Sequence, residues 1–179
     1  MSKIGKLNIS IPEKVKVALN GNILNIEGPK GKKNLDVDLN MFDFNIIDGK
    51  EISIKPKLLN DATKRLWGMN RSLLNNAIIG TSNGYEKILE LSGVGYRAAI
   101  KDKNLNLQLG FSHDINFPIP EGLNITVEKQ VIIKINGSDK QLVGMTASRI
   151  KSIRPPEPYK GKGIKEKGQY ILRKEGKKK

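Results

Sequence analysis

Alternation of apolar and polar residues is the dominant pattern along this chain. Val15, Val17 and Leu19 alternate with polar residues, and Leu24 and Ile26 resume the alternation after Asn20-Gly21. Two such runs joined at an Asn-Gly pair are typical of a β-hairpin with a type I′ turn. Further short runs bounded by Gly, Asn, Asp and Pro predict strands at 35–39, 51–55, 87–91, 98–101, 105–109, 114–117, 124–127 and 131–135.

Two segments instead have the apolar spacing of amphipathic helices. The first follows Asn60 or Asp61 as N-cap and ends at Gly80; the second follows Ser138 or Asp139 and ends before Pro155-Pro156. We interpret both apolar stripes as core packing and not as partner grooves. Their members are Ala62, Leu66, Met69, Leu73 and Ala77 in the first helix, and Leu142, Val143, Thr146, Ala147, Ile150 and Ile153 in the second.

The two halves of the chain resemble each other. Ile11-Pro12-Glu13 recurs as Ile119-Pro120-Glu121, and the apolar positions that follow match at the same offset. The helices share a Leu, Gly, Met and Ser at equal spacing, from Leu66 and from Leu142. Chance similarity between short β-rich segments is the alternative, but agreement in strands, turn and helix favours an internal duplication.

These patterns predict an α+β fold of two related modules, each a small, mostly antiparallel sheet packed on one helix. The expected boundaries are a first module at 1–81, a second at 82–153, and an extended basic C-terminal tail at 154–179. The tail begins where the composition changes to Pro, Gly and Lys.

Composition narrows the classes of function. The 179 residues include 32 Lys and Arg against 18 Asp and Glu, a net charge of +14, and residues 151–179 carry +8 of it. A positive field of this size predicts a polyanionic partner, either nucleic acid or an anionic membrane surface. No cysteine and one histidine, His113, exclude disulfides and thiolate or His-pair metal sites, so no metal and no cofactor is expected.

The same sequence gives no sign of a membrane or secretory destination. Its N-terminus lacks the apolar core of a signal peptide, and no apolar run approaches the roughly 20 residues of a membrane helix. We therefore expect a soluble, cytosolic protein. A merely solvated, disordered end is the alternative interpretation of the basic tail.

The residues of the tail itself favour RNA binding over simple solvation. Three prolines stiffen the backbone, Tyr159 offers a ring for stacking, and glycines between lysines let the backbone approach a phosphate. Basic residues of the second helix lead into this segment. The candidate RNA-binding residues of helix and tail are Arg149, Lys151, Arg154, Tyr159, Lys160, Gly161, Lys162, Gly163, Lys165, Lys167, Arg173 and Lys174.

A second candidate is the run Gly93-Val94-Gly95-Tyr96-Arg97. Two glycines before an aromatic residue and a guanidinium predict a bulge or tight turn. Such a turn presents Tyr96 and Arg97 to RNA, or it packs Tyr96 against its own sheet, and the sequence leaves both open. His113 is expected in a loop or at an edge, and Trp67 in or near the core.

The nonapeptide Pro-Glu-Pro-Tyr-Lys-Gly-Lys-Gly-Ile at 156–164 resembles the C-terminal signature of the large-subunit ribosomal protein six family, of the bacterial type. The resemblance extends over nearly the whole chain, from the opening SKIGKLNISIPEKVKV through EGPKG and GVGYRA to the final RKEGKKK. It implies two related α+β modules and binding of large-subunit ribosomal RNA through the second module and tail. It also implies ribosomal-protein neighbours, proximity to the translation-factor region, and RNA contacts at Arg154, Tyr159, Lys160, Gly161, Lys162 and Gly163, with Gly93, Gly95, Tyr96 and Arg97.

Two other classes remain as rivals. A nucleic-acid enzyme needs clustered carboxylates or a nucleophile–base pair, but the acidic residues here are scattered through turns and strands. A membrane-surface protein needs a broad basic helical face with large apolar anchors, whereas both predicted helices have ordinary core stripes. The sequence thus favours a structural RNA-binding protein that is not an enzyme, and the resemblance implies that it is a constituent of the large ribosomal subunit.

Overall fold

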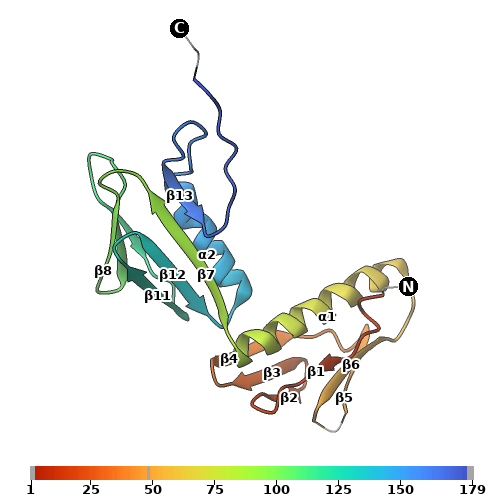
Figure 1. Ribbon diagram of the computed structural model, residues 1–179. Coiled ribbons are helices and arrows are strands. Elements are labelled where there is room, and N and C mark those ends of the chain that lie inside the picture. The colour runs from red at the N-terminus through yellow and green to blue at the C-terminus, as the bar shows by residue number, and fades with distance from the viewer. Residues whose placement is uncertain (1–2, 48, 177–179) are drawn as a thin grey trace. The chain divides into compact units, whose positions relative to one another are not determined.

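The computed structural model describes residues 3–47 and 49–176. The chain forms two compact units (Figure 1). Unit 1 consists of Met1–Gly84 with Ser138–Lys140, and unit 2 consists of Tyr85–Gly137 with Gln141–Lys179.

Unit 1 contains two three-stranded antiparallel sheets and one helix. The sheets have the orders β2-β3-β4 and β1-β6-β5, and the helix is α1 (Asp61–Ser82), which lies against β3, β4 and β6. The strands are β1 (Ile9–Ser10), β2 (Lys16–Asn20), β3 (Ile23–Gly28), β4 (Gly31–Asp36), β5 (Phe42–Ile47) and β6 (Glu51–Pro56).

Helix α1 begins as its sequence predicts, but the predicted core stripe is wrong for Ala62, Met69 and Leu73, which are exposed. The buried face is shifted by one position and consists mainly of Thr63, Trp67, Leu74, Ala77 and Ile78. The Asn60 N–H donates to Thr63 Oγ1 at 2.9 Å, which satisfies a backbone donor at the helix start. Trp67 is buried, and its Nε1 donates to the Ile54 carbonyl at 2.8 Å. The apolar face of α1 and the inner faces of both sheets therefore share one core.

Unit 2 also contains two antiparallel sheets and one helix, but its strands follow a different order along the chain. Its four-stranded sheet runs β11-β12-β7-β13, its three-stranded sheet runs β10-β9-β8, and every pairing is antiparallel. The elements are β7 (Tyr85–Ser92), β8 (Arg97–Lys101), β9 (Asn104–Gln108), β10 (Ile115–Pro118), β11 (Leu123–Glu128), β12 (Ile132–Gly137), α2 (Lys140–Ile153) and β13 (Gly163–Glu166).

The core of unit 2 includes α2 and both sheets. Val143, Ala147 and Ile150 from α2 are buried with Leu89 of β7 and Ile133 of β12. The α+β class with small antiparallel sheets and two helices, predicted from the sequence, is confirmed.

The expected extended tail is wrong for residues 163–166. These residues form β13, which pairs with β7 in the register Gly163↔Ser92 and Ile164↔Leu91, and Ile164 is fully buried in the unit 2 core. One apolar side chain in an otherwise Pro-, Gly- and Lys-rich segment gave no strand pattern. The strands β1 and β5 were not among the runs predicted from the sequence either.

Candidate nucleic-acid interface

The turn between β7 and β8 requires both of its glycines. Gly93 and Gly95 have φ of +158° and +79°, values that favour glycine. A Cβ on Gly93 would also lie 2.8 Å from the ring of Tyr96. The turn leaves Val94 exposed at 94% and Arg97 exposed at the start of β8.

Tyr96 itself packs inward. Its side chain is 7% exposed and belongs to the unit 2 core, so presentation of its ring to RNA is the wrong one of the two sequence-based interpretations. The ring faces Gly93 on one turn, and a Cβ on Gly110 of another turn would lie 3.4 Å from its Cε1. The buried Tyr96 ring therefore lies between the turn at Gly93 and the turn at Gly110 and sets the distance between them.

The second of these turns joins β9 to β10. Gly110 has φ of +73°, and Phe111, Ser112, His113 and Asp114 after it are all exposed. The rings of Phe111 and His113 stack with their centroids 6.3 Å apart and an interplanar angle of 26°. His113 is thus in a loop, as expected, and it stacks on Phe111, which was not among the predicted site residues.

The third segment, residues 154–163, connects α2 to β13. The Arg154 guanidinium carbon lies 4.8 Å from the centroid of the Phe111 ring, a cation–π contact. The Ile164 N–H donates to the Arg154 carbonyl, and the Glu157 N–H donates to the Lys162 carbonyl, both at 2.8 Å. The second bond closes a loop that leaves Tyr159, Lys160 and Lys162 exposed.

Gly163 allows this loop to close onto its own start. Its φ is +139°, and a Cβ there would lie 2.6 Å from the Pro155 carbonyl oxygen and 2.6 Å from Pro156 Cα. Since both neighbours are backbone atoms, they have little freedom to yield. Gly161 is buried with φ of +71°, so the signature glycines serve the loop's own geometry.

The three segments meet at one end of unit 2. Gly163 pairs with Ser92, which places the start of β13 beside the end of β7, as the blue and green arrows of Figure 1 show. Tyr96 joins the first two segments, and the Arg154–Phe111 contact joins the second to the third. We call residues 93–97, 110–114 and 154–163 together the loop cluster.

Two of the predicted RNA-binding lysines are held by carboxylates. Lys151 of α2 lies 3.1 Å from Glu166, and Lys165 lies 3.2 Å from Glu90 of β7. Glu166 also receives Lys87 at 2.8 Å, and the hydrogen bonds from Lys87 and Lys151 lower the pKa of its carboxyl below the ordinary value. These lysines fasten β13 to β7 and α2.

Other cations of the cluster have no such partner. Within the described part of the chain, Arg97, Lys160 and Lys162 form no ion pair and are exposed. Arg149 is likewise exposed on α2. An unpaired surface cation retains its full attraction for a phosphate, since no neighbouring carboxylate offsets its charge.

The last described residues return to the cluster. The Lys167 N–H donates to the Ile88 carbonyl at 3.0 Å, and the Lys174 N–H donates to the Pro158 carbonyl at 2.9 Å. Arg173 approaches Gly161 closely, because a Cβ on that glycine would lie 3.6 Å from Arg173 Nη2. A groove of about 360 Å³ runs here, and it is lined by Ser92, Gly161, Lys165, Gln169, Tyr170, Ile171 and Arg173.

This groove has the chemistry of an anion site. Its charged lining residues are Lys165 and Arg173, and no carboxylate lines it. Lys165 is turned partly to Glu90, so Arg173 supplies the more available charge.

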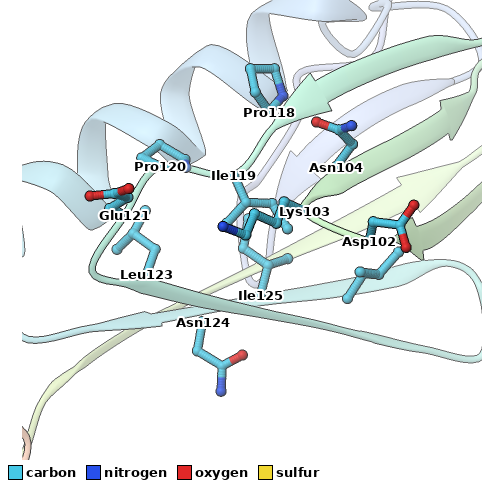
Figure 2. Close-up of a pocket in the computed structure, with 11 residues that line it drawn as sticks. Asp102, Lys103, Asn104, Pro118, Ile119, Pro120, Glu121, Leu123, Asn124 and Ile125 are labelled. Atoms are coloured by element: carbon cyan, nitrogen blue, oxygen red, sulfur yellow. The ribbon is translucent and has the colours of Figure 1, made fainter.

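A second hollow in unit 2, of about 530 Å³, has different chemistry (Figure 2). It lies at the Asp102–Lys103 turn, the opposite end of the β8–β9 hairpin from Arg97 and Gln108. Ile119, Leu123 and Ile125 supply apolar lining, and the rim mixes Asp102 and Glu121 with one lysine. Figure 2 shows Lys103 reaching across the hollow and Asn124 pointing away from it. Its rim therefore does not extend the positive surface.

The described residues contain no arrangement suited to metal chemistry. In residues 3–47 and 49–176, no three His, Asp or Glu side chains form a group that could hold a metal ion. No helix in the described ranges is long and apolar enough to cross a membrane. What the loop cluster can do is bind an extended polyanion, through unpaired cations and exposed rings held on a rigid sheet end.

Comparison with known proteins identifies relatives that match the whole chain. The model of the family described as Ribosomal protein L6 matches residues 92–167, which include the whole loop cluster. A relative from Beijerinckia indica, named large ribosomal subunit protein uL6, is 46% identical over 179 residues, covering all of both chains. Proteins of the same name from Parvibaculum lavamentivorans and Xanthobacter autotrophicus are each 47% identical, again over the whole of both chains.

Proposed function

Because the chain belongs to the ribosomal protein L6 family, we propose that it binds large-subunit ribosomal RNA through unit 2. The family consists of structural, non-enzymatic components of the large ribosomal subunit in the bacterial cytoplasm. The observation that carries the proposal is the loop cluster. It gathers three segments, distant in sequence, around exposed cations that no carboxylate of the described chain offsets.

In this proposal the loop at 157–162 lies along an RNA backbone. Its closing hydrogen bond and Pro158 hold Lys160 and Lys162 in place before RNA arrives, which reduces the entropy lost on binding. Tyr159, 57% exposed, is free to stack on a base or sugar. Gly161 contributes by keeping the loop narrow, so the recognition is of shape and phosphates more than of sequence.

The other proposed contacts differ in kind. Arg97, Arg149, Arg154, Lys167, Arg173 and Lys174 extend the positive surface around the loop. Lys151 and Lys165 add positive charge although each is paired with a carboxylate. Gly93, Gly95 and Gly163 shape the backbone and offer no side chain. Tyr96 acts from within the core. Neighbouring large-subunit proteins complete the proposed partners, and proximity to the translation-factor region is supported by the family resemblance alone.

The two units also support a common origin by duplication. The hairpins β2–β3 and β11–β12 both precede a helix in their units, and both bury alternate apolar residues, such as Leu24 and Ile26 in one and Ile133 and Ile135 in the other. Each unit then differs in where its additional strands are inserted. Duplication explains this shared order more simply than separate origins do.

The test is incorporation into the large subunit. Lys160→Glu/Lys162→Glu places two negative charges at the loop tip without touching a buried residue. On sucrose gradients of cell lysate, the wild-type protein should migrate with the large subunit at low and high salt, and the variant should stay near the top.

A matched control shows whether the effect depends on the position of the lysines or only on the change in net charge. Lys14 and Lys16 have the same spacing and are both exposed, but they lie on unit 1. Lys14→Glu/Lys16→Glu therefore makes the same change in net charge and should incorporate normally. Normal incorporation of the Lys160/Lys162 variant would remove the loop from the mechanism, and wild-type protein found only at the top of the gradient would refute the ribosomal role.

A further inference from the structure

Phe111 is a large apolar side chain that the unit 2 core does not use. It remains 40% exposed, whereas Leu109, two residues earlier, is fully buried and Phe117 packs against the core. Gly110, with φ of +73°, turns the chain out of the sheet just before it. Burial of an aromatic ring stabilises a fold, so a ring left exposed beside a well-packed core indicates a role other than folding.

The ring does not stand alone. The Arg154 guanidinium lies over Phe111 at 4.8 Å, and the His113 ring stacks with Phe111 at 6.3 Å. Three planar groups thus form a small assembly, and both rings belong to exposed residues. Such an assembly restricts the rotation of each ring, so a further planar group can stack on it with little additional loss of side-chain entropy.

The surroundings decide which planar group it accepts. Arg154 also accepts the Ile164 N–H through its carbonyl, which fixes the assembly to the start of β13 and to the loop that carries Lys160 and Lys162. Stacked rings, together with exposed, unpaired lysines in the loop that begins at Arg154, suit a nucleotide, since the phosphate and the base then have separate partners. The core of a protein–protein interface is depleted in lysine, so these surroundings suit a protein partner less well.

We propose that an unpaired RNA base stacks on the Phe111–His113 pair, while the neighbouring lysines hold the phosphates. The inference rests on the proposed RNA binding and adds a specific base contact to it. Stacking accepts any base, so the contact selects an unpaired nucleotide and not a sequence.

Ultraviolet cross-linking tests the contact directly. The full-length protein is bound to a transcript of the large-subunit ribosomal RNA, irradiated at about 254 nm, and digested with trypsin. Residues 104–129 form one tryptic peptide, because no Lys or Arg lies between Lys103 and Lys129. We expect a nucleotide adduct on this peptide, at Phe111 or His113. Adducts confined to other peptides would overturn the proposal.

Substitution provides the matched affinity measurement. Phe111→Leu keeps an apolar side chain but removes the stacking face, and should weaken RNA binding about fivefold or more, with the slope of affinity against salt unchanged. Phe111→Trp should restore the affinity. Urea unfolding of both variants shows whether the fold is kept, and the conservative Trp variant keeps the test decisive if Leu destabilises the loop.

The two proposals fail in different ways. If wild-type protein binds the transcript with strong salt dependence and Phe111→Leu binds equally well, the stacking contact is refuted and the RNA-binding role stands. If wild-type protein does not bind the transcript, both are refuted.

Discussion

At the scale of single residues, the loop cluster depends on side chains that are absent as much as on those present. Gly93 leaves room for the Tyr96 ring, and Gly163 leaves room for the backbone at Pro155 and Pro156. The sequence motifs in which these glycines occur are the ones that indicated RNA binding. Their first role is to let three backbone segments approach one another, and the exposed charges follow from that approach.

Substitution of Gly163 should therefore be costly. Gly163→Ala places a Cβ 2.6 Å from two backbone atoms and strains a positive φ. We expect the free energy of unfolding to fall by about 2–4 kcal/mol in urea titrations. Gly168→Ala is the matched control, because Gly168 has φ of +79° with nothing within 4 Å, and it should lose only about 1 kcal/mol. Equal losses at both sites would show that contact with the prolines is unimportant.

At the scale of elements, β13 is the strand that turns a basic segment into part of a sheet. Its Ile164 is buried, and its Glu166 forms ion pairs with Lys87 of β7 and Lys151 of α2. The carboxylate thus joins three elements at a partly exposed position. Lys151 and Lys165, which the sequence suggested as RNA-binding residues, therefore also hold this strand in place through ion pairs.

The Glu166 ion pairs predict a pH dependence. Because hydrogen bonds from Lys87 and Lys151 lower the pKa of the Glu166 carboxyl below its ordinary value, the folded state binds this proton less readily than the unfolded state does. The resulting stability is present above the unfolded pKa and is lost as pH falls through the lower, folded pKa. Urea titrations between about pH 7 and 3 should show a shallower decline for Glu166→Gln than for wild type.

Glu175→Gln is a suitable control for that series. Glu175 is exposed, and it forms no ion pair with any residue that the structure describes. Its variant should follow the wild-type curve. A Glu166→Gln curve parallel to wild type would show that solvent screens both ion pairs completely.

Elements with strong local signals were predictable from sequence, and elements defined by distant partners were not. Asn60 and Gly80 bracket the first helix closely, since α1 spans Asp61–Ser82. Strand β13 was missed because its partner β7 lies far back in the chain and Ile164 is its only apolar residue.

The candidate site was predictable to the same extent. Its exposed lysines were visible in the sequence, but the burial of Tyr96 and the stacking of Phe111 depend on tertiary packing. The signal that could have indicated Phe111 is the Gly110-Phe111-Ser112-His113 run, where strand alternation stops at a glycine and an aromatic residue follows.

At the scale of the whole molecule, charge is concentrated near the C-terminal end of the sequence. The protein carries +14, and residues 151–179 account for 11 Lys and Arg against 3 Asp and Glu. Two of these cations, Lys165 and Lys151, are held in ion pairs by Glu90 and Glu166. The other cations of this segment are available to neutralise RNA phosphates, which releases the counterions bound to the RNA.

Affinity for RNA should accordingly depend strongly on salt. If about 6 phosphates are neutralised, the log–log slope of affinity against salt should be on the order of −4 to −5. Filter binding of the full-length protein to the ribosomal transcript measures this slope. Lys160→Glu/Lys162→Glu should make the slope shallower, and an affinity independent of salt would contradict the electrostatic account.

The pairing of β13 with β7 also sets an order of events during synthesis. Unit 1 is almost complete once residue 84 has been made, whereas β7 must wait for residues 163–166 before its second edge is covered. A chain is made from its N-terminus, and contacts between distant residues form slowly. Until then β7 offers an open edge that invites pairing with other chains. A ribosome that stalls shortly before residue 163 would therefore leave unit 2 as an aggregation-prone intermediate while unit 1 folds normally.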